Sequence, residues 1–180
     1  MFQCFKGKDR IQPSARGEYE VGAAYNWLIA HKYKVDAMEI KGKWLDPGKF
    51  DDWLETNQYL LDKNVQSYHE SQLGEGSKIE GRVNIGENTT IINSTIRGPV
   101  SIGDNVTIKD SFIGPYTSIY HNCHIEKTHL ENSVLMEKVK LDNITKPIQN
   151  SIIGTEAEIS GEEAKHYMSL FVSELSHIKL

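Results

Sequence analysis

A six-residue periodicity in the second half of this 180-residue chain constrains its fold more than any other feature. Aliphatic residues recur at steps of six or five, three steps sum to 17, and a small or β-branched residue stands two positions before each. The aliphatic series is Ile85, Ile91, Ile96, Ile102, Ile108, Ile113, Ile119, Ile125, Leu130, Met136 and Leu141, and the small series is Val83, Thr89, Ser94, Val100, Val106, Ser111, Thr117, Cys123, Thr128, Val134 and Val139. This pattern predicts a solenoid with three short strands in each coil.

The expected fold is a mainly β, left-handed parallel β-helix, in which the aliphatic residue fills the interior of a triangular prism and the small residue lets the chain turn. A period of six gives no helical stripe, and antiparallel hairpins would show looser, irregular spacing. Glycine and asparagine tolerate positive φ, so we expect the bends between faces at Gly86, Gly103, Gly114, Asn88, Asn105 and Asn122. The pattern pauses near Lys146-Pro147 and resumes to Ile159, which predicts about five coils from Ile79.

The first seventy residues differ in kind. Two amphipathic helices are expected from helical spacing in two groups, Val21, Tyr25, Leu28, Ile29 and then Trp53, Leu54, Asn57, Leu61. A short strand is expected between them at about Val35–Ile40, followed by a loop from Gly42 to Gly48. Ser67–Ser77 has the polar, glycine-containing composition of a linker. We therefore predict a small α/β segment over residues 1–70 and a β-helix domain over 71–180.

The last twenty residues admit two interpretations. Ser160 with Glu163 fits the start of a helix, whereas residues 169–180 include the alternation of a strand. We expect a strand.

Composition narrows the class of protein. The net charge is −5, no apolar run approaches the roughly 18 residues of a membrane span, and no signal-peptide core follows Met1. Cys4 and Cys123 lie too far apart for a CxxC motif, and acidic residues outnumber basic ones by 25 to 20 without a basic stripe. We expect a cytoplasmic protein with free thiols and with neither a membrane nor a nucleic-acid partner.

Four phrases resemble the long form of glucose-1-phosphate thymidylyltransferases, sugar-phosphate nucleotidylyltransferases with a C-terminal left-handed β-helix. They are IQPSARGEYEV from Ile11, KWLDPGK from Lys43, STIRGPV from Ser94 and SFIGPYTSI from Ser111. The resemblance implies a Rossmann-like half that binds a nucleoside triphosphate, and magnesium held by two aspartates, the second of which is Asp46 here. It also implies that Arg16, Glu18, Glu20 and Trp44 support a sugar-phosphate pocket.

Other sequence features of that family have no counterpart in this chain. No Gly-rich phosphate loop, no Glu-Lys-Pro phrase and no first metal aspartate can be found. Gly22-Ala23 replaces the usual Thr-Asp, and Pro47 replaces the threonine of Asp-Thr-Gly, so that a hydroxyl and an N–H are missing. We therefore expect the C-terminal part of such an enzyme, inactive alone, with no tightly bound magnesium.

Association is the expected role of the isolated chain. On this interpretation both helices lack a domain that covers them, so apolar surface at Tyr25, Leu28, Trp53 or Leu61 stays uncovered. The flat faces of a triangular solenoid also suit contact between copies. We expect a homo-oligomer, either a dimer or a trimer, in which the β-helix is a structural module.

Simpler interpretations stand beside these assignments. Asp46-Pro47-Gly48 is a common turn, charged residues often begin helices, and Trp44 is a plausible packing residue. Cys123 occupies a small inward position, which makes it a core residue. The alternative function is acetyl-CoA-dependent acyl transfer of the hexapeptide-repeat type, for which His121 or His124 is the candidate base, although both fall at outward positions.

Overall fold

The computed structural model describes all residues except 1, 8, 67–72, 162–170, 173–176 and 180. It divides into two compact units, Met1–Trp44 and Leu45–Leu180. This division falls after Trp44, whereas the boundary expected at 70/71 followed the change in sequence pattern. None of the helices in the described part of the chain is long and apolar enough to cross a membrane.

The first unit contains a 3-10 helix, η1 (Phe2–Phe5), and α1 (Val21–Ala30). Its small core joins Cys4, Ile11 and Ala24, against which Trp27 packs. The helix predicted here is confirmed, but the strand expected at Val35–Ile40 is wrong, because these residues have no regular secondary structure. A strand exists only as part of a hydrogen-bonded ladder, and none of the described residues pairs with this segment.

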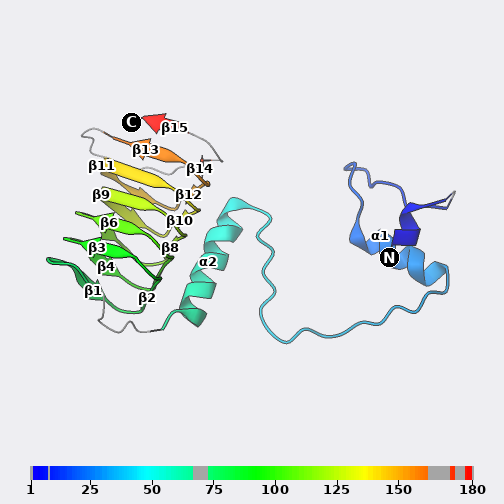
Figure 1. Cartoon of the computed structure of the whole chain (residues 1–180). Helices are drawn as coiled ribbons and strands as arrows, with labels where there is room; N and C mark the ends of the chain where they lie inside the picture. The colour runs from blue at the N-terminus through cyan, green and yellow to red at the C-terminus, as the bar shows by residue number, and fades with distance from the viewer. Residues whose placement is uncertain (1, 8, 67–72, 162–170, 173–176, 180) are drawn as a thin grey trace. The chain divides into compact units, whose positions relative to one another are not determined.

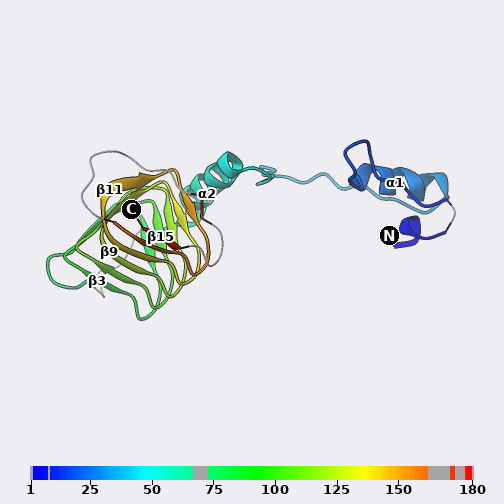
Figure 2. The same ribbon diagram turned by 90° about the horizontal axis from the view of Figure 1, so that it is seen from above.

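The second unit consists of α2 (Phe50–Asn64) and a parallel β-solenoid of about five coils (Figures 1 and 2). Its strands are β1 (Lys78–Glu80), β2 (Val83–Ile85), β3 (Thr90–Ile92), β4 (Thr95–Arg97), β5 (Val100–Ile102), β6 (Thr107–Lys109), β7 (Phe112–Ile113), β8 (Thr117–Ile119), β9 (His124–Glu131), β10 (Val134–Leu135), β11 (Lys140–Gln149), β12 (Ile152–Ile153), β13 (Glu158–Ser160), β14 (Phe171–Val172) and β15 (His177–Lys179). The mainly β, β-helix prediction is confirmed, and so is a strand rather than a helix at β14 and β15. Glu163, on which the helical alternative rested, lies outside the described residues.

Two parallel sheets make up the solenoid. The six-stranded sheet has the order β14-β12-β10-β8-β5-β2, and its outward side is called the helix face below. The nine-stranded sheet holds the other strands and covers two faces, because β9 and β11 each continue around a corner. Each strand therefore lies on the equivalent strand of the preceding coil.

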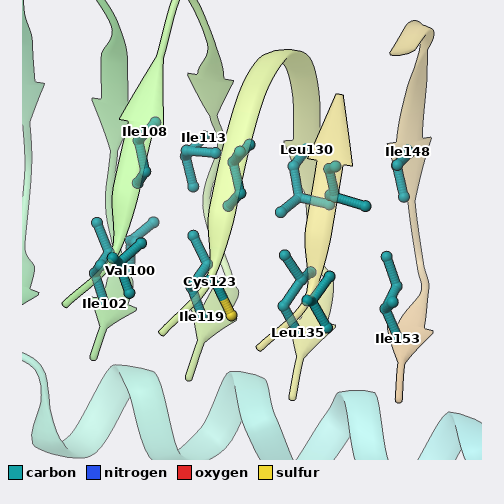
Figure 3. Packing of buried hydrophobic residues seen from close by; sticks show 14 of the residues in the cluster. Val100, Ile102, Ile108, Ile113, Ile119, Cys123, Leu130, Leu135, Ile148 and Ile153 are labelled. Atoms are coloured by element: carbon teal, nitrogen blue, oxygen red, sulfur yellow. The ribbon is translucent and has the colours of Figure 1, made fainter. Parts of the chain in front are cut away.

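The predicted interior register holds through most of the solenoid. Ten of the eleven small positions are buried, and the aliphatic residues stack from coil to coil (Figure 3). Val106 is fully buried while Thr107 beside it is half-buried. Ile85, in the first coil, is only partly buried against the core.

One part of the register was wrong. Leu135 is 1 % exposed and lies beside Ile119, whereas Met136 is half-buried, so the inward pair is Ser133 and Leu135 rather than Val134 and Met136. The coil there is 16 residues long instead of 17, because one corner is a residue shorter. Three successive apolar residues at this point leave the sequence pattern unable to choose between the registers.

The following coil is longer. Leu135 lies beside Ile153 of β12, a step of 18 residues. The extra length forms a bulge in β11 between Ile144 and Ile148. The pause predicted near Lys146-Pro147 is this bulge. The core then resumes, as expected, with Ser151, Ile153, Ala157 and Ile159, and all four are buried.

The corners use asparagine and glycine for different reasons. Asn88, Asn105 and Asn122 have φ of 55°, 56° and 60°, as predicted, and their amides form a ladder at 3.4 and 3.3 Å. Gly86, Gly103 and Gly114 were wrongly expected at positive φ. A Cβ on Gly103 would lie 2.9 Å from the His121 backbone nitrogen of the next coil, so these glycines are needed where coils approach closely.

Helix α2 packs on the helix face of the solenoid (Figures 1 and 2). The side chain of Asn57 donates to the Tyr116 carbonyl at 2.8 Å and accepts from the Ser118 hydroxyl at 2.5 Å. Leu54 and Leu61 are buried, and Arg82 pairs with Asp62 at 2.8 Å. The expectation that Leu61 would be uncovered was therefore wrong.

Candidate functional site

Asp46 lies in a turn that is fixed to the start of α2. The Gly48 amide donates to the Asp46 carbonyl at 2.8 Å, and the Trp53 indole donates to the Pro47 carbonyl at 2.6 Å. Trp53 therefore has a structural role, although 42 % of it remains exposed. The Asp46 side chain is exposed to solvent, which makes its carboxylate accessible to a ligand.

The described residues do not by themselves fit a magnesium ion. No three His, Cys, Asp or Glu side chains gather within the part of the chain that the structure describes. Magnesium requires a nearly ideal octahedral shell of oxygens, and Asp46 offers one carboxylate. Any magnesium bound through Asp46 needs ligands from elsewhere.

The other four predicted site residues lie in the Met1–Trp44 unit. Arg16 Nη2 and Glu20 Oε1 are 2.8 Å apart, and this hydrogen bond, together with one from Ser14, lowers the pKa of Glu20. Glu20 stands at the N-cap of α1 but makes no side-chain cap there. Glu18 and Trp44 are exposed, with 76 % of Trp44 accessible. The structure thus brings Arg16 and Glu20 together.

The Arg16–Glu20 pair is solvated. Its side chains are 75 % and 42 % exposed, and an exposed ion pair of this kind stabilises a fold only weakly. The loop before α1 is nevertheless closed by backbone bonds, since Ser14 donates to Glu18 and Gly17 donates to Ser14, both at 2.8 Å. The pair is therefore held near the beginning of α1 by the loop.

His121 and His124 lie at outward positions, as predicted, and both are half-buried. His121 Nδ1 accepts from the Asp104 amide at 2.9 Å, and the ring packs edge-on against Tyr120. His124 Nε2 is 3.6 Å from Glu126 Oε2, and the hydrogen bond from Lys109 lowers the pKa of Glu126. Because the Asp104 amide already donates to His121 Nδ1, this nitrogen is not available to act as a base.

A groove near His129 escaped the sequence analysis. It has a volume of about 480 Å³ and is lined by Phe112, His129 and the Thr145 bulge, among others. His129 Nε2 lies 3.2 Å from Glu131 Oε1, and Gln149 donates to Glu131 Oε2 at 2.9 Å. The 17-residue spacing of Phe112 and His129 places them side by side, with ring centroids 4.5 Å apart, and this spacing was the available signal.

Cys123 is a core residue, as predicted. It is 2 % exposed, and its thiol lies 3.1 Å from the Met136 carbonyl as a hydrogen-bond donor. Burial raises the pKa of this thiol to about 11, so it stays protonated and unreactive at neutral pH.

Curated proteins similar to this chain are nucleotidyltransferases. A low-salt glycan biosynthesis nucleotidyltransferase of Haloferax volcanii is 38% identical over 181 residues, which cover 98% of this chain and 50% of the relative. A glucose-1-phosphate thymidylyltransferase of Streptomyces antibioticus is 35% identical over 150 residues, covering 83% of this chain and 42% of the relative. A bifunctional sugar-1-phosphate nucleotidylyltransferase/acetyltransferase of Sulfurisphaera tokodaii is 36% identical over 87 residues, covering 48% and 21%.

These similarities confirm the resemblance found in the sequence. The chain is related to the sugar-1-phosphate nucleotidylyltransferases over most of its length, and it spans about half the length of the first two relatives. No protein-family model matches it.

Proposed function

We propose that the chain is the β-helix half of a sugar-1-phosphate nucleotidylyltransferase, in which the assembled enzyme converts glucose 1-phosphate and dTTP to dTDP-glucose and diphosphate. The observation that carries this proposal is a match over 98% of the chain to half of a nucleotidyltransferase. The name of the Streptomyces relative supports glucose 1-phosphate and a thymidine nucleotide as substrates.

In this proposal the solenoid is a structural and oligomerisation module. Its core is closed within each coil, and α2 occupies the helix face. The outward residues elsewhere pair between coils, for example Lys138 with Glu156 at 3.0 Å and Arg97 with Glu80 at 2.8 Å. These pairs between coils support a rigid scaffold. In this proposal the scaffold holds subunits together as a dimer or a trimer.

The proposal gives roles to the exposed residues near the two helices. Asp46 is one magnesium ligand of the assembled enzyme, and the remaining ligands come from outside the described residues. Arg16, Glu18, Glu20 and Trp44 belong to the sugar-phosphate side of the pocket. Aligning the phosphates and neutralising their charge account for most of the catalysis of phosphoryl-type transfer.

Formation of nucleotide-sugar tests the proposal. The 180-residue chain should give none, whereas a chimera that joins it to the unmatched part of the Streptomyces antibioticus relative should form dTDP-glucose. In the chimera, Asp46→Asn should lower turnover by about a hundredfold without altering the circular dichroism spectrum. Asp51→Asn, also exposed but in the first turn of α2, is the matched control and should leave turnover unchanged.

Two results would contradict this assignment. Turnover by the 180-residue chain alone would place the active site elsewhere. Full activity of the Asp46→Asn chimera would leave Asp46 with its structural role in the turn only.

Acetyl-CoA-dependent acyl transfer is the second candidate function, because the Sulfurisphaera relative is named as an acetyltransferase as well. His129, with one nitrogen oriented by Glu131 and a groove beside it, is better placed as a base than His121 or His124. The test is CoA release from acetyl-CoA with an amino-sugar phosphate as acceptor. His129→Gln should abolish release and His124→Gln should not, while no release from the unaltered chain would remove this candidate.

A further inference from the structure

Helix α2 keeps an apolar flank partly in solvent, although its inner face packs on the solenoid. Trp53 and Leu60 are 42 % and 47 % exposed. Leu54 and Leu61, the residues that follow them, are 6 % and 4 % exposed. Seven residues are almost two helical turns, so Trp53 and Leu60 lie one above the other on α2. These two side chains are called the apolar stripe below.

The contacts of α2 with the solenoid show which way the apolar stripe faces. Gln58 donates to the Asn132 side chain at 2.9 Å, and Asp62 pairs with Arg82 at 2.8 Å. Asn132 and Arg82 come just before β10 and β2, so this flank of α2 lies over the corner where the chain enters the helix face. The apolar stripe is at least about 140° away from Gln58 and Asp62 around the helix axis, which puts it on the opposite flank.

That opposite flank faces the corner where the strands of the helix face end. Tyr120 follows β8 at this corner and is 54 % exposed, and Met136 follows β10 and is half-buried. A groove of about 290 Å³ lies on the same side, lined by Ser118, Val134, Tyr120 and Met136 among others. Exposed tryptophan and tyrosine are the residue types most enriched where one protein binds another. The apolar stripe and this corner therefore have the character of a protein interface.

The charges of α2 suit a second copy of the same helix that runs in the opposite direction. The first turn of α2 carries Asp51 and Asp52, and its last turn carries Lys63. An antiparallel neighbour brings the basic end of each helix to the acidic end of the other. A twofold axis makes both copies present the same surface, so that surface must complement itself. The outer flank of α2 meets this condition.

The side-chain spacing on this flank is also that of a short helix pair. Trp53, Thr56, Leu60 and Lys63 follow each other at steps of three, four and three residues, as in the seam of a coiled coil. An antiparallel pair sets Trp53 on the aliphatic stem of the partner's Lys63 and Leu60 on the partner's Thr56. The Thr56 hydroxyl already donates to the Asp52 carbonyl at 2.6 Å, so the methyl group of Thr56 is left for the contact.

We propose that two copies of this chain associate about a twofold axis through the outer flank of α2 and the Tyr120 corner. The proposal rests on the oligomerisation role proposed above and names the surface for it. Helix α2 has 15 residues and is about 22 Å long, so the helix pair needs the corner to reach the size of a specific interface. An interface at the small end of the range fits a dissociation constant on the order of 10 µM.

The nucleotide-binding half of the assembled enzyme is the alternative occupant of this flank. It would be a different surface, which requires no match between the two ends of α2. A trimer also requires none, because its contacts join two different surfaces of each copy. The opposite charges at the two ends of one helix therefore favour a second copy in a dimer.

Sedimentation equilibrium of the 180-residue chain tests the proposal. The chain should be mainly dimeric at about 200 µM and mainly monomeric at about 1 µM. Leu60→Gln should raise the dissociation constant at least about tenfold. The matched control is Ile92→Gln, which changes an aliphatic residue that is 38 % exposed on the nine-stranded sheet. This control should alter the dissociation constant by less than about twofold.

An exchange of charges tests the antiparallel orientation. Lys63→Glu should raise the dissociation constant about fivefold, because it sets an acid against Asp51 and Asp52 of the partner. Asp52→Lys added to the same chain should bring the dissociation constant back to within about twofold of its original value. A further weakening by Asp52→Lys would overturn the antiparallel arrangement.

The other outcomes are distinct. A monomer at about 200 µM would overturn the proposal, and this result is expected if the nucleotide-binding half covers the flank. An oligomer that Leu60→Gln does not weaken would also overturn it but would keep the oligomerisation role on another surface. Circular dichroism checks that each variant is folded, and Tyr120→Gln gives the same test should Leu60→Gln lose helical signal. Formation of dTDP-glucose by the chimera reports on the proposed reaction separately.

Discussion

The two units of this chain differ in how much of their structure they complete by themselves. The core of the solenoid joins twenty buried residues, each coil covering the next, whereas the core of the Met1–Trp44 unit joins three. Strand pairing in the solenoid links residues 16 to 19 positions apart, so every coil finds its partner nearby in the sequence. In the first unit, the Val35–Ile40 segment pairs with none of the residues that the structure describes.

This difference teaches that each coil of a repeat packs on coils that are near it in the sequence. An α/β segment instead needs packing partners that are remote in the sequence. In a solenoid, stability is a sum of coils and their interfaces. In a mixed sheet, a strand is stable only when strands remote in sequence are present. The predictions below separate the two units, beginning with the largest expected effect.

A charge placed in the solenoid interior should be the most damaging change. Ile108→Asp buries a carboxylate at a position that is 0 % exposed, and should lower the free energy of unfolding by about 4 kcal/mol. Thr107→Asp, the adjacent half-buried position, should cost under about 1 kcal/mol. Urea unfolding followed by circular dichroism measures both, and equal losses would contradict the interior register.

Adjacent leucines of α2 test whether this helix belongs to the solenoid. Leu61 is 4 % exposed and Leu60 is 47 % exposed. Leu61→Ala should therefore destabilise the unit by about 3 kcal/mol, and Leu60→Ala by less than about 0.5 kcal/mol. If the two alanine variants unfold at the same urea concentration, α2 does not depend on the contact with the helix face.

Two glycine-to-alanine substitutions compare a position where coils approach closely with an open position in the first unit. A Cβ at position 103 would meet the backbone of Tyr120 and His121 at 2.9 Å, whereas position 22 has nothing within 4 Å. Gly103→Ala should cost about 2 kcal/mol, and Gly22→Ala, inside α1, should be neutral or stabilise by about 0.5 kcal/mol. Thermal unfolding compares them, and a harmless Gly103→Ala would mean that the coils can separate freely.

The smallest expected effect is the pH dependence due to Cys123. Its pKa rises from 9.0 to about 11 in the folded protein, so the folded state holds the proton more tightly than the unfolded state. The stabilisation is fully present below pH 9 and is lost as the pH rises toward 11, by about 1 kcal/mol at pH 9.5. Cys123→Val should remove this component, and an identical pH profile for both proteins would show that the thiol is not desolvated.

The fold of the second unit was largely predictable because its repeat is local. The interior series was correct apart from Val134 and Met136, where three consecutive apolar residues allowed either register, and Ile85, which is only partly buried. Close approach at Gly103 and the contact of Asn57 with Ser118 were not predictable, since they depend on how distant residues meet in space.

The candidate site was less predictable than the fold. The turn at Asp46 was anticipated, but the hydrogen bond from the Trp53 indole that holds it was not. The contact between His129 and Glu131 depends on side-chain orientation, which a period in the sequence does not specify. The Val35–Ile40 segment shows the reverse case, because its sequence favours a strand but none of the described residues pairs with it.

Hydrogen exchange of the two helices in the 180-residue chain tests the central claim most directly. We predict that the amides of α2 (Phe50–Asn64) exchange together with the solenoid strands, through global unfolding of the Leu45–Leu180 unit. The amides of α1 (Val21–Ala30) should exchange at least about a hundredfold faster, through local opening. Exchange of α2 at the rate of α1, or protection of α1 equal to that of the solenoid, would contradict the division of this chain into one self-sufficient and one incomplete unit.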